Sequence, residues 1–198
     1  MELKEFDKSF LSKSIKYIAG VDEAGRGPLA GPVVAAAVIF DEPTKIPKVN
    51  DSKKLSEKLR EELYGEIIKK CKSYGIGIVY QTEIDEINIL QAALKAMQLA
   101  VFNLKTEPNL ILIDGNKSFN SKIQTKTIVK GDSKSFSIAA ASILAKVTRD
   151  RIMQNESKKY PEYLWNKNKG YGTKEHIEAI KKFGKTEFHR NSFLKNIL

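Results

Sequence analysis

The sequence contains few residues that bind soft metals or form covalent cross-links. Among 198 residues there are one cysteine, Cys71, and two histidines, His176 and His189. A single cysteine excludes an intramolecular disulfide and a thiolate metal cluster. Neither histidine lies at a spacing typical of a zinc site or of a Ser-His-Asp triad, so we interpret both as structural residues.

Long hydrophobic runs are also absent. No apolar run approaches the length that spans a bilayer, and residues 1–7 carry acids in place of the apolar segment of a secretion signal. With so little cysteine, this favours a reducing, cytoplasmic compartment and no membrane partner. The sequence has no internal repeat, low-complexity run or linker, so its length predicts one domain over residues 1–198. Nothing in it indicates an obligate protein partner, and we expect a monomer.

Positive charge is in excess. The chain has 34 Lys and Arg residues against 24 Asp and Glu residues, which gives a net charge of +10. A basic balance of this kind favours polyanionic partners, with nucleic acid first among them. Clusters of carboxylates stand out against this background, because each cluster needs a compensating cation.

The first hydrophobic run ends in two acids and a glycine-rich turn. Residues 17–21 read as a buried strand, followed by Asp22-Glu23-Ala24 and then Gly25-Arg26-Gly27-Pro28. Successive side chains on a regular strand point to opposite faces, so Asp22 and Glu23 reach one ion only if the strand breaks at Glu23. The glycines could supply such a break, and they open the main-chain amides to a ligand. The alternative is an acidic turn before an ordinary glycine loop.

The rest of the chain alternates strand and helix patterns. Four large apolar residues at 110–113 predict a strand buried on both faces, hence central in a sheet with helices on either side. The strand at 33–40 follows the first so closely that we expect an antiparallel pair. Other strands are predicted over residues 75–80 and 125–130, and helices over residues 56–71, 86–105, 132–156 and 173–183.

Two further acids stand at the ends of predicted elements. Asp114 ends the central strand, where ligand sites of open α/β sheets lie, although a turn-forming Asp-Gly is the alternative. Asp132 begins the long helix, where it could also be a simple cap. If both converge with Asp22 and Glu23, the like charges require a cation, and ligands that are all oxygen select Mg²⁺ or Mn²⁺. This chemistry suits metal-assisted phosphoryl transfer.

Several motifs together resemble the ribonuclease HII family, the type 2 ribonucleases H. They occur in the order typical of that family and cover the chain from about residue 17 to residue 193. The motifs are Asp22-Glu23-Ala24-Gly25-Arg26-Gly27-Pro28, Asp51-Ser52-Lys53, Ile113-Asp114-Gly115, Gly131-Asp132-Ser133 with residues 137–147, and Gly170-Tyr171-Gly172-Thr173.

The resemblance implies a fold and an activity. The expected fold is α/β and ribonuclease H-like, with a mixed, roughly five-stranded sheet flanked by helices and a C-terminal helical region at about residues 160–198. The expected enzyme is an endonuclease that cuts the RNA strand of RNA–DNA hybrids. It also cuts beside single ribonucleotides embedded in duplex DNA, and it leaves a 3′-hydroxyl and a 5′-phosphate. Such an enzyme would serve DNA replication and repair.

The resemblance also assigns roles to residues. Asp22, Glu23, Asp114 and Asp132 would be the catalytic acids that bind Mg²⁺ or Mn²⁺. Gly25, Arg26 and Gly27 would contact the ribose 2′-hydroxyl through their main chain, and Tyr171 would stack on the neighbouring deoxyribose. On physical grounds, a tyrosine between two glycines has little local packing, so its ring is available to stack on a base or sugar; the alternative is a hydrophobic anchor for the C-terminal helix. Candidate phosphate contacts, with solvated charge as the alternative, are Lys53, Ser133, Lys134, Lys146 and Arg149.

Three other interpretations remain open from the sequence. Ribonuclease HIII has the same fold and chemistry, but its pattern usually has lysine in place of Arg26 and an additional N-terminal domain. A non-catalytic nucleic-acid-binding module would use the acids only as caps. A metal-dependent phosphatase of small substrates is the third, which the basic composition and the lack of a nucleotide-cradling loop disfavour.

Overall fold

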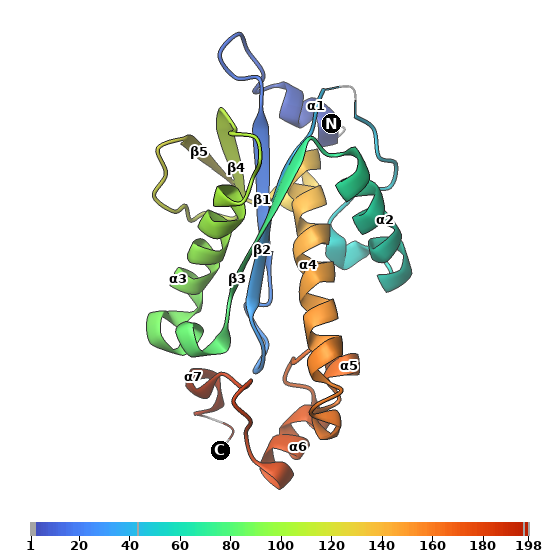
Figure 1. Ribbon diagram of the computed structural model, residues 1–198, viewed down its shortest axis with the longest axis vertical. Helices are drawn as coiled ribbons and strands as arrows, with labels where there is room; N and C mark the ends of the chain where they lie inside the picture. The colour runs from blue at the N-terminus through green and yellow to red at the C-terminus, as the bar shows by residue number, and fades with distance from the viewer. Residues whose placement is uncertain (1–2, 43, 196, 198) are drawn as a thin grey trace.

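A mixed sheet of five strands forms the centre of the molecule. The computed structural model describes residues 3–42, 44–195 and 197, and its strands lie in the order β3-β2-β1-β4-β5 (Figure 1). The middle strand β1 is antiparallel to β2 and parallel to β4, which confirms the predicted hairpin pair and mixed sheet. The strands are β1 Ile18–Ala24, β2 Val33–Ile39, β3 Ser73–Val79, β4 Leu110–Asp114 and β5 Gln124–Ile128.

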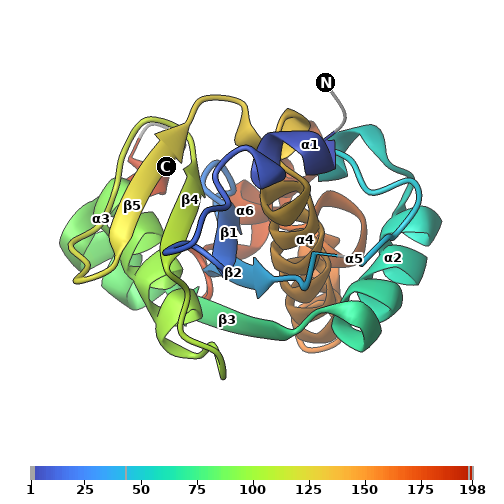
Figure 2. The ribbon, with the colours of Figure 1, turned by 90° about the horizontal axis from the view of Figure 1, so that it is seen from above.

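Helices cover both faces of this sheet. Helix α3 (Gln81–Phe102) packs on one face, while α4 (Phe136–Glu156) packs on the other with α2 (Glu57–Lys70) beside it (Figure 2). None of the described helices is long and apolar enough to cross a bilayer. The remaining helices are α1 Leu3–Lys8, α5 Trp165–Asn168, α6 Lys174–Phe183 and α7 Asn191–Leu194, with short 3₁₀ turns η1 Ser52–Lys54, η2 Gly131–Ser133 and η3 Pro161–Tyr163.

Helix α4 lies unusually close to β1. A Cβ atom added at Gly20 would be only 2.2 Å from the carbonyl carbon of Ser137. The first half of α4 is rich in small residues, and Ala139, Ala140 and Ala141 are all fully buried. The close approach places the start of α4 beside the middle of β1, where Asp22 faces the same side as Gly20.

The C-terminal region packs at one end of the sheet (Figure 1). Its core contains Tyr163, Trp165, Ile180 and Phe188. These residues cover Leu29 and Ala30, which belong to the loop between β1 and β2. We call residues 25–32 the glycine loop. The C-terminal region therefore supports this loop directly.

Several predicted boundaries are wrong. Helix α3 begins at residue 81 and bends at Asn88 (φ 66°, ψ 163°), whose side chain accepts hydrogen bonds from the N–H groups of Leu90 and Gln91. Strand β5 ends at residue 128, because Lys130 has a left-handed backbone that leaves the sheet. Helix α4 begins four residues later than predicted, since Ser135 is its N-cap.

Candidate active site

Three aspartates from three separate elements meet beside β1. Asp22 comes from β1, Asp114 from the end of β4, and Asp132 from the turn η2 that precedes α4. One carboxylate oxygen from each lies within 4.8 Å of the other two. The parallel pairing of β1 with β4 causes this meeting, because Val21 pairs with Ile113 and the next residues of the two strands are the acids.

Hydrogen bonds fix the carboxylates in place. The Gly131 N–H donates to Asp114 Oδ1 at 2.6 Å, which ties the end of β4 to the turn that carries Asp132. The Glu23 N–H donates to Asp22 Oδ1 at 2.7 Å. Asp132 does not cap α4 as the alternative interpretation held, because Ser135 does so and Asp132 is free to face the other acids.

The carboxylates lie in an environment that disfavours their negative charge. Asp22 is 5% exposed, and its pKa is raised well above the usual range by burial and by the nearby charges of Glu23 and Asp114. The pKa of Asp132 is also raised, by burial and then by Asp114. A bound cation would relieve both effects. A cationic group also lies beside these carboxylates, since Lys53 Nζ is 3.8 Å from Asp132 Oδ2.

Glu23 does not belong to the group of carboxylate oxygens that lie within 4.8 Å of one another, although its charge is close enough to raise the pKa of Asp22. Strand β1 remains regular through Ala24, which pairs with Val34, so the predicted break at Glu23 is wrong. Glu23 therefore points to the opposite face from Asp22, and its Oε1 lies 3.4 Å from Arg26 Nη1. Together with Asp114 it lines a cavity of about 180 Å³. The prediction that Glu23 binds metal is not tested by this geometry.

The glycine loop and Tyr171 lie side by side. A Cβ atom at Gly27 would be 3.7 Å from the ring carbon Cε1 of Tyr171, and Tyr171 is 43% exposed. Gly25 has φ +100°, and a Cβ atom there would lie 2.2 Å from Arg149 Nε. The backbone conformation and this tight packing both require glycine at position 25.

The candidate phosphate contacts are placed differently from one another. The Lys53 side chain is 81% exposed beside the aspartates, and the Lys146 Nζ lies 2.7 Å from Asp150 Oδ1. Ser133 Oγ donates to the Lys130 carbonyl oxygen, and Lys134 Nζ donates to that of Val129. All four remain predictions as phosphate contacts.

Arg149 does not contact phosphate, contrary to the prediction. It is 1% exposed, and its guanidinium donates to the carbonyl oxygens of Ala30, Pro32 and Lys169. The sequence held a signal for this burial, because Ala145 and Met153 stand four residues before and after Arg149 on the same helix face. A second buried arginine, Arg190, carried no such signal and was missed.

The mixed sheet, with acids gathered between β1, β4 and the start of α4, defines the class of ribonuclease H-like nucleases. The ribonuclease HII family model matches residues 19–196 of this chain. The chain therefore belongs to the ribonuclease HII family, whose members are endoribonucleases, and the resemblance seen in the motifs is confirmed.

Known relatives and structures agree with this assignment. A ribonuclease HII of Caldanaerobacter subterraneus is 56% identical over 197 residues, covering 100% of this chain and 82% of that protein. A ribonuclease HII of Clostridioides difficile is 57% identical over 197 residues, covering 100% of this chain and 75% of that protein. The crystal structure of ribonuclease H2 from Pyrococcus horikoshii has a TM-score of 0.76 at 29% identity, covering 91% of this chain and 96% of that chain.

The ribonuclease HIII alternative has less support. Bst-RNase HIII in complex with Mn²⁺ has a TM-score of 0.63 at 20% identity, covering 87% of this chain and 64% of that chain. Similarity at this level shows a shared fold only. The family assignment also sets aside a non-catalytic binding module, because ribonuclease HII is an enzyme family.

Proposed function

We propose that this protein hydrolyses the RNA strand of RNA–DNA hybrids and cuts at single ribonucleotides within duplex DNA, leaving a 3′-hydroxyl and a 5′-phosphate. The observation that carries the proposal is the meeting of Asp22, Asp114 and Asp132 within 4.8 Å. These acids repel one another in a buried position, so they are built to hold a divalent cation. A single domain, a monomeric state and a cytoplasmic location stay predictions.

The donor set suits Mg²⁺ or Mn²⁺. The three aspartates supply only carboxylate oxygens, the ligands that hard divalent cations prefer over zinc. Glu23, which shares a cavity with Asp114, would complete the set. A protein of similar fold, Bst-RNase HIII, has been solved with Mn²⁺. When bound, such ions activate a water for attack on the phosphodiester and stabilise the leaving oxygen.

The glycine loop and Tyr171 would select the substrate. Only the 2′-hydroxyl distinguishes RNA from DNA at a given nucleotide, and Gly25, Arg26 and Gly27 offer main-chain groups at close approach to read it. Tyr171 stands beside Gly27 with its ring exposed. A ring packed against a sugar leaves no room for a 2′-hydroxyl, so Tyr171 would favour deoxyribose at the adjacent position. Lys53, Ser133 and Lys146 would contact the phosphates.

A metal-dependent cleavage assay tests this function. We expect the protein with Mg²⁺ or Mn²⁺ to cut a DNA duplex that contains one ribonucleotide and to leave an all-DNA duplex intact. EDTA should abolish cleavage, and excess metal should restore it. Asp22→Asn removes one carboxylate charge from the metal site, and we expect a loss of about a hundredfold or more in rate.

The matched control is Asp41→Asn, since Asp41 is a surface aspartate paired with Lys72. This variant should cleave at the parent rate. Cleavage that persists in EDTA, or equal cleavage of the all-DNA duplex, would contradict the proposed function.

A further inference from the structure

Arg190 is a fully buried cation that binds the glycine loop. It is 0% exposed, and its guanidinium donates to three carbonyl oxygens: that of Gly25 at 2.6 Å, that of Arg26 at 3.1 Å and that of Gly31 at 2.9 Å. No carboxylate among the described residues forms a salt bridge with it. The main chain of the glycine loop is therefore its principal partner.

A buried guanidinium with no carboxylate at salt-bridge distance is costly unless its donors are satisfied, and the charge of Asp85 offsets only part of this cost. Burial and the neighbouring charge of Arg149 lower the pKa of Arg190 to about 9, so it stays charged at neutral pH. The rigid fork of arginine suits three acceptors at once, which a single ammonium group on a flexible stem does not. This arrangement holds the carbonyl groups of Gly25 and Arg26 in fixed directions.

The directions of the Gly25 and Arg26 carbonyls also determine where the N–H groups of Arg26 and Gly27 point. A trans peptide unit is planar, and its N–H points opposite to its C=O. Because the Gly25 and Arg26 carbonyls point toward the buried Arg190, the N–H groups of Arg26 and Gly27 point away from it. These N–H groups are among those that the proposed function assigns to the 2′-hydroxyl.

The segment that carries Arg190 is tied to the same loop by its main chain. The Arg190 N–H donates to the Leu29 carbonyl at 2.8 Å, and the Gly31 N–H donates to the Phe188 carbonyl at 2.8 Å. These bonds flank an isolated bridge between Ala30 and His189. The segment is therefore attached to the glycine loop on both sides of Ala30.

Two buried histidines continue the connection to Tyr171. The Thr186 N–H donates to His189 Nδ1 at 2.9 Å, so His189 carries its proton on Nε2 and donates it to His176 Nε2 at 3.2 Å. His176 Nε2 also accepts from Trp165 Nε1 at 3.0 Å. His176 is then protonated on Nδ1, which donates to the Tyr171 carbonyl at 2.9 Å. This pair of neutral tautomers gives every contact a donor and an acceptor, with the single lone pair of His176 Nε2 shared between His189 and Trp165.

The histidine pair is suited to a fixed structural link. Burial, and the proximity of His176, lower the pKa of His189 to about 4, and burial also lowers the pKa of His176. Both rings are therefore neutral at neutral pH, and their hydrogen bonds do not change with pH near 7.

We propose that Arg190 and the pair His176–His189 are positioning residues that hold the glycine loop and Tyr171 as one rigid unit. The ribonucleotide and the deoxyribonucleotide beside it would then be read at a fixed spacing. This inference rests on the proposed function, which assigns recognition of the 2′-hydroxyl to the glycine loop and stacking on the deoxyribose to Tyr171. It adds that discrimination between substrates depends on buried residues that touch neither the nucleic acid nor the metal.

The test uses Arg190→Lys and His176→Asn. Lysine keeps the charge but cannot bind three carbonyls, and asparagine keeps a donor near the Tyr171 carbonyl but loses the contact with His189. For both variants we expect kcat on a duplex with one ribonucleotide to fall about tenfold or more, because small misplacements of a substrate are costly. Cleavage of a uniform RNA–DNA hybrid should fall several-fold less, and Mn²⁺ affinity should stay within about twofold.

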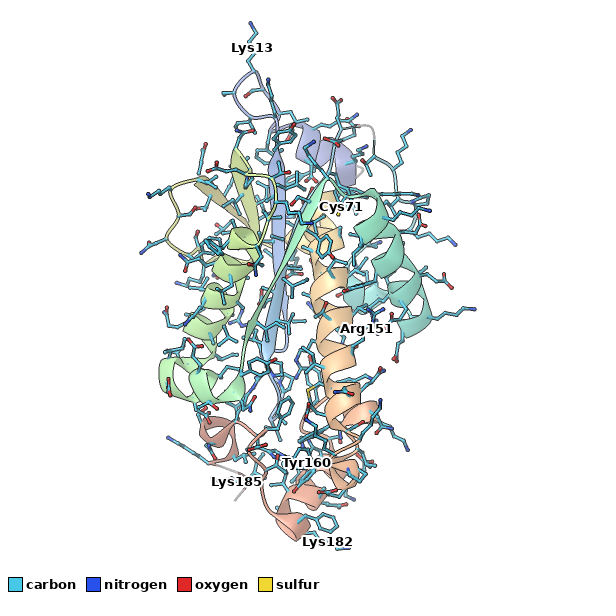
Figure 3. The ribbon with its side chains drawn as sticks, in the orientation of Figure 1. Lys13, Cys71, Arg151, Tyr160, Lys182 and Lys185 are labelled. Carbon is cyan, nitrogen blue, oxygen red and sulfur yellow. The ribbon has the colours of Figure 1, made fainter. Side chains whose placement is uncertain are left out.

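Arg151→Lys is the matched control. Arg151 lies on the same helix as Arg149 but on the surface, paired with Glu61 (Figure 3), and this variant should behave as the parent. Circular dichroism melts establish that each variant is folded. If Arg190→Lys does not fold, His176→Asn decides the outcome.

Two results would overturn the inference. One is a folded variant that cleaves both substrates as the parent does, and the other is a loss by the same factor on both substrates. A parent enzyme that fails to distinguish one ribonucleotide from all-DNA would instead refute the proposed function. The two failures are therefore separable in one set of assays.

Discussion

Tyr171 is the residue that we propose stacks on the deoxyribose beside the ribonucleotide. Its ring stands beside Gly27, with Lys146 Nζ 6.0 Å and the Arg149 guanidinium 5.9 Å from the ring centroid. One face is supported by the protein while the residue remains 43% exposed. A sugar packed on the exposed surface would meet a rigid, preformed partner.

We predict that Tyr171→Ala lowers cleavage at a single embedded ribonucleotide by about tenfold, because aromatic stacking on a nucleotide contributes about 1–3 kcal/mol. Tyr171→Phe keeps the ring and should stay near the parent rate. Metal affinity, measured by Mn²⁺ titration, should be unchanged in both variants. Equal cleavage by Tyr171→Ala and the parent would contradict a stacking role.

For single residues, the sequence predicts which positions belong to the site better than it predicts where their side chains point. Asp22, Asp114 and Asp132 could be selected because each ends or interrupts a recognisable element. The placement of Glu23 could not, since it depends on β1 staying paired as far as Ala24. The burial of Arg149 depends on carbonyl groups more than 100 residues away in the chain. No local pattern contains those partners.

At the scale of elements, the geometry of the site depends on the contact between β1 and α4, which are far apart in the sequence. Gly20 permits the two backbones to approach, and this approach sets the distance between Asp22 and the turn that carries Asp132. The four-residue delay in the start of α4 matters here, because it leaves Asp132 outside the helix.

We predict that Gly20→Ala destabilises the protein by about 3 kcal/mol or more, because the added methyl group would lie 2.2 Å from a backbone carbon of α4. The matched control is Gly65→Ala in α2, where nothing lies within 4 Å of the added Cβ. There we expect a gain of about 0.5–1 kcal/mol from better helix propensity. Urea unfolding of both variants measures the difference. A Gly20→Ala variant as stable as the parent would show that the two elements can separate freely.

Most elements could be predicted from hydrophobic pattern, and their failures have physical causes. The strands at 33–39 and 110–114 contain short, continuous apolar runs, which are typical of buried strands. The bend in α3 was missed because it occurs at Asn88 and not at a glycine or proline. Asparagine tolerates a positive φ and caps the following turn with its own side chain.

At the scale of the whole molecule, a chain with a net charge of +10 holds a local group of three acids. Lys53 is a cationic residue at this acidic group, since it pairs with Asp132 while most of its side chain is exposed. Burial alone would lower the pKa of Lys53, but Asp22 and Asp132 raise it overall.

We predict that the affinity for a duplex falls steeply with salt concentration, and that Lys53→Gln reduces the slope of log K against log salt by about one. Lys13→Gln is the control, because Lys13 extends into solvent at the tip of a loop (Figure 3) and its loss should leave the slope unchanged. Binding titrations at four salt concentrations measure both. An unchanged slope in Lys53→Gln would remove Lys53 from the phosphate contacts.

The attachment of the glycine loop through its carbonyl oxygens has a consequence for protein engineering. Arg149 and Arg190 recognise the path of the peptide chain and not the identity of the side chains along it. The Arg26 side chain makes none of these contacts, so substitution there would remove its ion pair with Glu23 but leave the contacts of both arginines to the main chain in place. A combinatorial library at position 26 would therefore vary the side chain offered to the nucleotide while the main chain of the glycine loop keeps its path.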